Sequence, residues 1–292
     1  MKTIVTHDGK FHADDVCAVA ALSLLIDGPV EIIRTRDEEK INNGDFVVDV
    51  GGVFDADAQL FDHHQEDGAG VRENGIPYAA FGLVWKTYGE KLCGSATVAK
   101  KIDTDMVSPL DADDNGVEIF KSEIKGVRPY SLTNVINTFV STWKETDRDN
   151  DIAFAELVKF VKALLAREIV RARAKEEAEE IVKKVYEETE DKRIIILDGM
   201  YPSLEILSKF PEPLYFIRPG SDGKWRVEAV KDDPKSFTAR KDFPKEWAGK
   251  RDEEMAKISG VSDAVFCHRG LFLAVANSRE GAIALAKLAV ES

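Results

Sequence analysis

The sequence has few of the features that mark secreted or membrane-spanning proteins. It contains only three cysteines in 292 residues, Cys17, Cys93 and Cys267, and an odd number so widely spaced is typical of reduced thiols rather than of a disulfide framework. No apolar run approaches the roughly 20 residues of a membrane-spanning helix. The start, MKTIVTHDGKFHADD, has neither the apolar stretch of a secretory signal nor an Arg-rich presequence. These absences predict a cytoplasmic protein with no membrane partner.

Positive charge is also scarce. The chain has 40 Lys and Arg against 53 Asp and Glu, a net charge of −13. Residues 191–292 hold 17 basic and 16 acidic residues, which leaves 23 and 37 for residues 1–190. Strong nonspecific binding to nucleic acid is not what this balance predicts. A bound metal would neutralise part of the acidic charge, so the repulsion that a phosphate would feel is smaller than the count suggests.

The first half has the pattern of an α/β domain. Hydrophobic residues make up 44% of the chain and charged residues 32%, which is typical of a globular protein, and the length favours two domains. Strands that alternate with helices predict a mostly parallel sheet, with ligands bound at the carboxyl ends of its strands. The predicted strands are 2–6, 30–35, 46–50 and 58–61, and the predicted helices are 13–26 and 78–92.

The rest of the chain divides into a helical segment and a second α/β domain. Residues 151–190 contain no Gly or Pro and are rich in Ala, Leu, Lys and Glu, which predicts one or two long helices. We therefore expect a metal-binding catalytic domain at 1–150, a helical connector at 151–190 and a smaller substrate-binding domain at 191–292. Strands are expected in the last of these at 194–197, 214–217, 225–230, 264–267 and 271–276, followed by a helix at 281–290.

Histidine and aspartate gather where the first strands end. Four of the five histidines fall in the first 64 residues. Each of these residues alone has an ordinary explanation, such as a helix cap or a surface group. Together, at three successive strand ends, they predict a metal site. The residues are His7, His12, Asp14, Asp49, Asp62, His63 and His64.

Such a set suits the attack of water on a phosphoryl group. Two divalent cations about 3.5–4 Å apart can activate a shared water and stabilise the leaving oxygen. Asp49 is the natural carboxylate to bridge them. Histidine ligands favour Mn²⁺, although Mg²⁺ also fits.

Four ordered motifs carry a family resemblance. The strings HDGKFHADD, VVDVGG, FDHHQ and LDADDNG resemble the motifs of the DHH phosphoesterase superfamily. In detail they resemble the branch named after the melanocyte proliferating gene, whose members are described as metal-dependent 3′–5′ exonucleases. The resemblance continues through GLVWKTYG, WRVEAV and FPKEWAGKRDEE to residue 286, so it covers nearly the whole chain.

The resemblance implies a role for each motif residue. His64 would lie beside the scissile phosphate as a charge stabiliser or proton donor, and Asp62 would orient a neighbouring ligand. In LDADDNG, either Asp111 or Asp114 could be the last metal ligand, and Asp111 is slightly preferred. In most DHH enzymes the first motif has two aspartates, whereas here His12 takes the first of those places. The implied metal ligands are therefore His7, His12, Asp14, Asp49 and His63, with Asp111 or Asp114.

In such enzymes the second domain usually grips the substrate. Arg240, Arg251 and His268 are the cationic candidates, because a guanidinium can hold a phosphate with two hydrogen bonds. Trp225 and Trp247 could stack on bases, although Trp225 could equally belong to the core and Arg251 could pair with neighbouring acids. The triple-glycine-histidine signature of the short-oligonucleotide phosphodiesterases is absent, since Arg269-Gly270 follows His268.

The sequence thus predicts a two-domain α/β phosphoesterase, with substrate held between a dinuclear site and the second domain. The favoured reaction is 3′–5′ exonucleolytic hydrolysis of RNA or another single-stranded nucleic acid. One alternative is hydrolysis of a small nucleotide or a pyrophosphate-type metabolite, which the acidic surface suits better. Another is a metal-bound interaction or nucleic-acid-binding module without catalysis. Substrate length, RNA or DNA preference, the physiological metal and the oligomeric state, a homodimer included, stay open.

Overall fold

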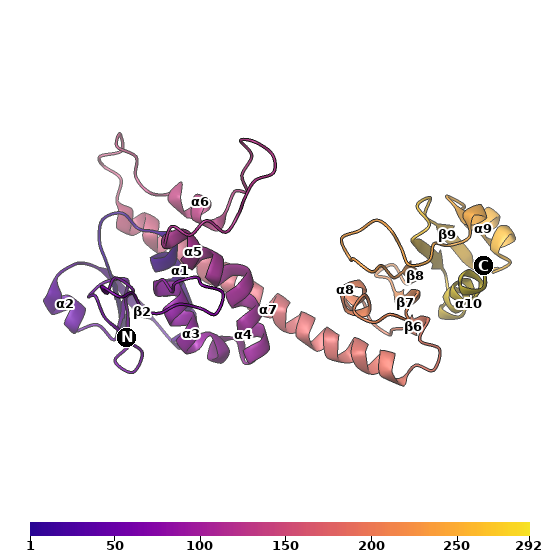
Figure 1. The fold of residues 1–292 in the computed structure, drawn as a ribbon, viewed down its shortest axis with the longest axis horizontal. Helices are drawn as coiled ribbons and strands as arrows, with labels where there is room; N and C mark the ends of the chain where they lie inside the picture. The colour runs from indigo at the N-terminus through magenta and orange to yellow at the C-terminus, as the bar shows by residue number, and fades with distance from the viewer. The chain divides into compact units, whose positions relative to one another are not determined.

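Two five-stranded β-sheets organise the chain (Figure 1). The structure is a computed structural model that describes residues 1–292. It divides into two compact units, Met1–Arg173 and Ala174–Ser292, and the division falls inside the helix α7 (Asn150–Glu188). The segment expected to contain one or two helices is thus one helix of 39 residues. The α/β class and the two-unit organisation agree with the sequence prediction.

The sheet of the first unit is mostly parallel, as predicted. Its strand order is β2-β1-β3-β5-β4, and only β4 runs antiparallel to its neighbour. Because neighbouring parallel strands end at the same edge, the residues that follow β1, β3 and β5 meet there. The strands are β1 (Lys2–Thr6), β2 (Val30–Arg34), β3 (Phe46–Val48), β4 (Phe54–Asp55) and β5 (Leu60–Phe61).

β2 ends one residue before its predicted end, and β3 and β5 are each two residues shorter than predicted, for a backbone reason. β3 ends at Val48 because Asp49 turns out of the strand with a φ of 53°. β5 begins at Leu60 because Gln59 has a φ of 63°. Both values lie in the left-handed region, which an extended strand cannot include.

Helices cover this sheet and complete the first core. α1 is buried along most of its length, from Ala13 to Ser23, and α3 packs against it. The predictions at 13–26 and 78–92 match α1 and α3, whereas helices of one or two turns carry too little periodic signal to be predicted. The helices are α1 (Ala13–Leu25), α2 (Glu38–Asn42), α3 (Ala80–Cys93), α4 (Ala96–Ile102), the π-helical turn η1 (Asp103–Val107), α5 (Ser108–Asp114) and α6 (Leu132–Asn137).

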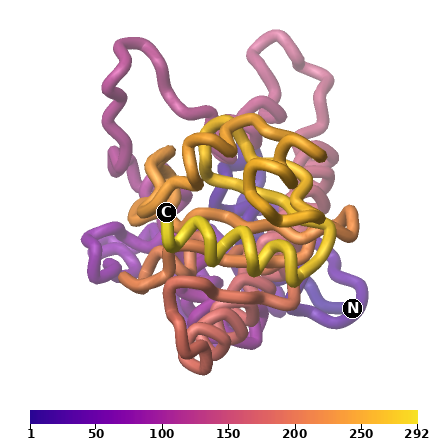
Figure 2. The backbone as a smooth tube through the Cα atoms, turned by 90° about the vertical axis from the view of Figure 1, so that its right-hand side faces the viewer, coloured from indigo at the N-terminus to yellow at the C-terminus, as the bar shows by residue number.

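The second unit has a mixed sheet of order β6-β7-β8-β10-β9, in which only β6 and β7 are parallel. α10 packs across β7, β8, β9 and β10 and appears in yellow in Figure 2. The elements are β6 (Ile194–Ile196), α8 (Ser203–Leu207), β7 (Tyr215–Pro219), β8 (Trp225–Ala229), the 3₁₀ turn η2 (Lys245–Trp247), α9 (Asp252–Ser259), β9 (Ala264–Cys267), β10 (Leu273–Ala276) and α10 (Arg279–Glu291).

None of the helices combines the length and the apolar character needed to cross a lipid bilayer. Even α7, which is long enough, has a second half dominated by Lys, Arg and Glu (RARAKEEAEEIVKKVYEE).

Candidate metal centre

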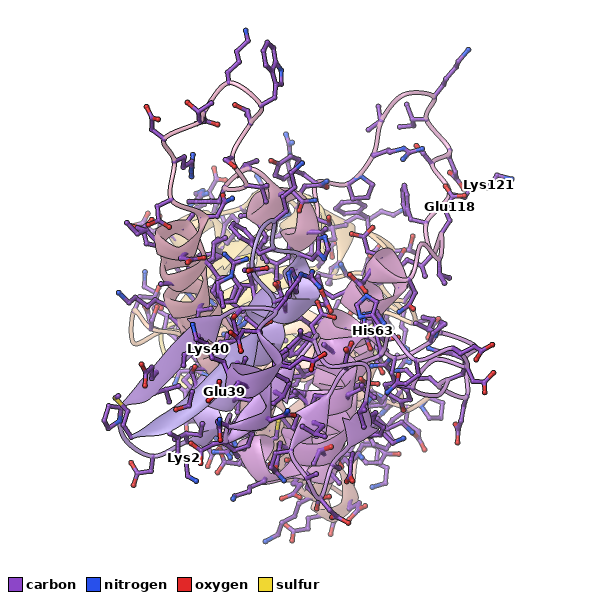
Figure 3. The ribbon with its side chains drawn as sticks, turned by 90° about the vertical axis from the view of Figure 1, so that its left-hand side faces the viewer. Lys2, Glu39, Lys40, His63, Glu118 and Lys121 are labelled. Carbon is purple, nitrogen blue, oxygen red and sulfur yellow. The ribbon has the colours of Figure 1, made fainter.

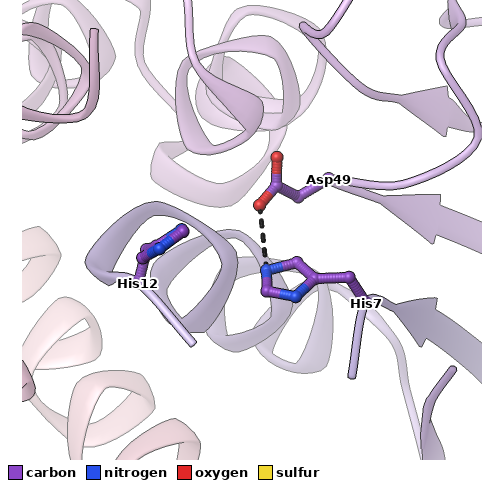
Figure 4. A group of neighbouring side chains, drawn as sticks. All are labelled: His7, His12 and Asp49. Atoms are coloured by element: carbon purple, nitrogen blue, oxygen red, sulfur yellow. Dashed lines mark ion pairs between the residues drawn. The ribbon is translucent and has the colours of Figure 1, made fainter. Parts of the chain in front are cut away.

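Three strand ends meet at Asp49. His7 directly follows β1 and Asp49 directly follows β3, whereas one residue, Asp62, separates His63 from the end of β5. The Nε2 atom of His7 lies 3.3 Å from one Asp49 oxygen, and Nε2 of His63 lies 3.3 Å from the other (Figure 4 draws the first pair). The sheet therefore brings together residues that are up to 56 positions apart in the sequence.

Two helix ends add further ligand-type side chains. His12 and Asp14 come from the start of α1, and Asp114 is the last residue of α5. Their potential ligand atoms lie within 4.8 Å of one another, and Nε2 of His63 lies 3.3 Å from Asp114. Three overlapping groups result: His7, His12 and Asp49; Asp49, His63 and His64; and His12, Asp14 and Asp114.

Several carboxylate oxygens in this cluster are buried without a hydrogen-bond partner. They are both oxygens of Asp14, Oδ2 of Asp15 and Oδ1 of Asp49, of which the last two lie 3.1 and 3.3 Å from Nε2 of His7 and of His63 without hydrogen-bond geometry. A buried charged oxygen without a partner is costly, and coordination to a cation removes that cost. Imidazole nitrogens and carboxylate oxygens are also the donor types that divalent transition metals prefer. The residues present therefore fit a divalent metal site.

The metal-free cluster holds protons. Although burial lowers the pKa of His7, its contacts with Asp15 and Asp49 raise that pKa to about 10. Burial raises the pKa of Asp49, but His63 and His7 outweigh it and lower that pKa to about 2. Burial and the neighbouring carboxylates of Asp49 and Asp114 hold the pKa of Asp14 well above its usual range. The cluster thus has more carboxylates than positive groups to neutralise them, and a bound cation would supply the missing positive charge.

The backbone at Asp49 is strained in a way that aims its carboxylate. A non-glycine residue with a φ of 53° is uncommon, and Asp tolerates this region better than most. The following turn uses Gly52, whose φ of 70° suits glycine and whose N–H donates to Oδ2 of Asp62 over 2.6 Å. Such conformations cluster at functional sites because the surrounding structure must maintain them.

Asp62 and His64 form a separate pair at the rim of the cluster. Oδ1 of Asp62 accepts a hydrogen bond from the backbone N–H of His64 (3.2 Å) and lies 2.7 Å from its Nδ1. Asp62 is buried, whereas 63% of the His64 side chain is exposed. The buried carboxylate fixes the ring, and a ring whose Nδ1 is held in this way presents Nε2 as its second nitrogen.

Asp111 and Asp114 lie in different environments, although they share one short helix. Asp111 is fully buried away from the histidines: Oδ2 lies 2.7 Å from Nη1 of Arg72, and Oδ1 accepts a hydrogen bond from the Gly82 N–H (3.0 Å). A Cβ on Gly82 would come within 1.8 Å of Asp111, so glycine is required there. The preference for Asp111 as the last ligand thus disagrees with the geometry, because its oxygens are already occupied.

Two residues of this region were not among the predicted site residues. Asp15 is fully buried and lies 3.1 Å from Nε2 of His7. In the sequence it is the second acid of the run ADD, which is also typical of an ordinary helix N-terminus. Arg72 joins Asp111 to Asp103, with guanidinium nitrogens 2.9 and 3.2 Å from the Asp103 carboxylate. No local pattern marks Arg72, because its partners lie 31 and 39 residues away.

In the second unit, the side chain of Arg240 is occupied by structural hydrogen bonds. It donates to the backbone carbonyls of Ser208, Phe210 and Pro213 and also pairs with Asp232. Its side chain is only 9% exposed. Arg240 therefore ties loops of its own unit together, and the guanidinium is not free to hold a phosphate.

Arg251 and His268 belong instead to a run of stacked cationic and aromatic side chains. The guanidinium of Arg251 lies 4.4 Å from the ring centroid of Phe266, which contacts the ring of His268 at 6.2 Å. His268 lies 4.4 Å from Phe272, and the Lys231 amino group lies 5.9 Å from that ring. Arg251 thus contacts an aromatic ring rather than the neighbouring acids.

The two tryptophans of this unit differ in exposure. Trp247 is 3% exposed and packs on Phe243 in the core, so it cannot stack on a base. Trp225 is half-buried at the start of β8.

Comparison with known proteins gives a family match over almost the whole chain. The family model MYG1_exonuc, described as uncharacterised protein family UPF0160, matches residues 3–290. The MYG1 protein of Dictyostelium discoideum is 32% identical, over 97% of this chain and 95% of its own length. The MYG1 exonuclease of Homo sapiens is 29% identical, over 97% of this chain and 84% of its own.

A further relative and one solved structure also match. A MYG1 protein of Schizosaccharomyces pombe is 29% identical over 99% of this chain and 97% of its own length. A crystal structure of an uncharacterized protein from Helicobacter pylori G27 covers 94% of this chain and 93% of its own at 12% identity, with a TM-score of 0.31. That structural likeness is too weak to support an argument.

Proposed function

Since the chain belongs to the MYG1_exonuc family, we propose that it is a metal-dependent phosphoesterase that removes nucleotides in the 3′–5′ direction from RNA or another single-stranded nucleic acid. The observation that carries the proposal is the cluster of histidines and buried, unpartnered carboxylate oxygens at one edge of the first sheet. The human relative, whose name is MYG1 exonuclease, supports the nuclease class.

We assign the metal ligands from the geometry of that cluster. Asp49 faces histidines on both sides and is the candidate to bridge two ions. Bound divalent cations, with Mn²⁺ favoured and Mg²⁺ as the alternative, would activate water and neutralise charge on the phosphoryl group. The proposed ligands are His7, His12, Asp14, Asp49, His63 and Asp114.

The chain's own residues supply the proton transfer. His64 is held through Nδ1 by Asp62, so in the doubly protonated ring Nε2 is the atom that donates a proton to the leaving oxygen, and the ring is left neutral with its Nδ1 proton still hydrogen-bonded to Asp62. The exposure of His64 leaves this nitrogen accessible to a phosphate. Asp62 acts through His64 and is a positioning residue.

In the second unit, Arg251 and His268 are the proposed substrate contacts. Both belong to the run of cationic and aromatic side chains around β9, in which Arg251 directly precedes α9 and His268 directly follows β9. This run offers charge for a phosphate and rings for a base. Arg240 is left out of this proposal because of its structural hydrogen bonds.

The test is hydrolysis of end-labelled oligonucleotides by the pure protein with Mn²⁺. Stepwise shortening of a 5′-labelled strand, lost on addition of EDTA, is the expected result. Rapid turnover of pyrophosphate or a mononucleotide without any stepwise products would assign the site to small phosphorylated substrates, the alternative that the acidic first half favours. Tight metal binding with no turnover on either substrate class would indicate a binding module.

Binding of Mn²⁺ is expected to release protons and to become tighter as the pH rises. In the metal-free site the pKa of His7 is raised to about 10 and that of Asp14 is raised well above its usual range, so both groups carry protons near neutral pH. A metal ion needs the deprotonated forms and displaces those protons. The affinity should therefore increase until the pH passes the pKa of His7.

Calorimetric titration in two buffers of different ionisation enthalpy would count the protons released per ion. An affinity that does not change between about pH 6 and pH 9, with no proton release, would contradict this protonation of the metal-free cluster. The same titration of His7→Gln, in which the main titrating ligand is gone, should release fewer protons.

A further inference from the structure

We propose that the two loops on either side of α6, residues 117–130 and 138–149, form a separate site that binds a single strand of nucleic acid by stacking on its bases. The inference rests on the proposed function, because it assigns these loops to the same class of substrate. Figure 3 shows both loops projecting from the same side of the first unit, with Glu118 and Lys121 labelled on one of them.

These loops expose an unusual share of the unit's aromatic surface. The first unit has four exposed aromatic side chains, and three of them lie here: Phe120 at 48%, Tyr130 at 70% and Trp143 at 86% exposure. The fourth is Phe160 on α7. Concentrated exposed apolar side chains mark binding surfaces, because leaving them in water is unfavourable.

Cations without acidic partners accompany the rings. Lys121, Lys125 and Arg128 in the first loop and Lys144 in the second are exposed and form no ion pair. The amino group of Lys144 lies 5.1 Å from the ring centroid of Trp143. Rings interleaved with free cations are the combination by which proteins bind single strands, with bases on the rings and phosphates on the cations.

The first loop also encloses a hollow of about 540 Å³. Its lining includes Phe120, Ile124 and Val127 together with the cations Lys121 and Arg128 and one acid, Glu123. This volume is within the range of ordinary ligand sites, and a mainly apolar lining with two cations against one acid suits a base with its attached phosphate.

Both loops are anchored beside the proposed metal ligands. The first loop begins at Val117, three residues after Asp114, so their Cα atoms lie within about 11 Å even in extended chain. α6, which connects the two loops, packs against α1 and α5 and is fixed by the fully buried Ile136. A strand bound by the loops could therefore continue from the base of the first loop toward Asp114.

The charge pattern favours a strand over a membrane or a protein partner. Acidic residues such as Glu118, Glu123 and Glu145 alternate with the rings and cations in the same loops. A flat apolar interface would have to desolvate these acids, and the continuous surface of an anionic bilayer would face all of them at once. A single strand contacts only the rings and cations that it reaches and leaves the acids in water.

The test is binding of a fluorescently labelled oligouridylate to the full chain in EDTA, where hydrolysis cannot occur. Tyr130→Ala and Trp143→Ala should each weaken binding by roughly five-fold to a hundred-fold, the cost of losing one stacked base. Phe160→Ala, which removes an exposed ring of the same unit outside the loops, is the matched control and should leave the affinity unchanged. Circular dichroism would confirm that all variants are folded.

Tryptophan emission gives a second readout that does not depend on any variant. Trp143 is the one fully exposed tryptophan, since Trp85 and Trp247 are each 3% exposed and Trp225 is half-buried. Unlabelled oligouridylate should quench the solvent-exposed part of the emission in a saturable way.

Three results would overturn the proposal: equal affinity in wild type and both loop variants, an emission shift with anionic phospholipid vesicles but not with oligonucleotide, or burial of Trp143 by self-association alone. Failure of the proposed function has a different signature, because it would abolish Mn²⁺-dependent hydrolysis while binding in EDTA remained.

Discussion

Replacement of His64 by alanine is expected to lower the rate of hydrolysis by about 10²–10⁴-fold, the usual contribution of a positioned general acid, while metal content stays near normal. The reason lies in its bonding: Nδ1 is held by Asp62 at 2.7 Å, and the exposed ring leaves Nε2 free for the leaving oxygen. Turnover of an oligonucleotide and metal content by mass spectrometry are the two measurements. Full activity in the variant would refute the role given to His64.

A second variant, Asp62→Asn, tests whether Asp62 acts through His64, and the metal content of His64→Ala tests whether His64 is itself a ligand. Asp62→Asn keeps the shape of the residue that holds His64 but removes its charge, so it should lower turnover less than His64→Ala and change the pH profile. His64 also lies 3.4 Å from Asp49 and within ligand distance of His63. Loss of a metal ion in His64→Ala would therefore identify His64 as a ligand instead.

The two aspartates of α5 are expected to respond in opposite ways to the same substitution. Asp114→Asn should reduce Mn²⁺ binding sharply, because the carboxylate lies with His63 and Asp14. In the metal-free protein the same change should leave the stability of the fold nearly unchanged, because it removes a charge that raises the pKa of Asp14 but also removes the carboxylate that lies 3.3 Å from His63. Calorimetric Mn²⁺ titration and thermal unfolding in EDTA would measure the two effects.

Asp111→Asn should instead destabilise the fold by about 1–3 kcal/mol, the cost of weakening buried hydrogen bonds to Arg72 and Gly82. Asp111 is fully buried, and Arg72, whose side chain is 6% exposed, would keep only Asp103. Any metal-binding defect should be smaller than that of Asp114→Asn under conditions where the variant is folded. The reverse pattern, a stable Asp111→Asn protein without metal, would restore Asp111 as the ligand.

The positions of the candidate metal ligands in the first unit could be read from the sequence because they follow strands. β1, β3 and β5 are short apolar runs, and His7, Asp49 and His63 come directly or closely after them, so a parallel sheet brings them to one edge. α1 was predictable from its continuous apolar run. These features depend only on local pattern and on one general rule of sheet topology.

The choice between Asp111 and Asp114 could not be read in this way. The two are three residues apart on one helix, and what separates them is Arg72, which is 39 residues from Asp111. Arg240 is a similar case, since its partners are backbone carbonyls that have no signature in the sequence. Side-chain type indicates what a residue can bind, whereas tertiary contacts decide what it does bind.

Because the backbone at Asp49 is left-handed, substitutions of this residue can test both its backbone conformation and its charge. Asparagine tolerates a φ of 53° about as well as aspartate and has nearly its outline, so Asp49→Asn changes only the ionic character. Glycine would relax the main chain yet delete the oxygen donors, and glutamate would preserve the anion while straining the turn and overreaching by a methylene. Asp49→Asn thus isolates the electrostatic contribution, whereas the glycine and glutamate replacements each change two properties at once.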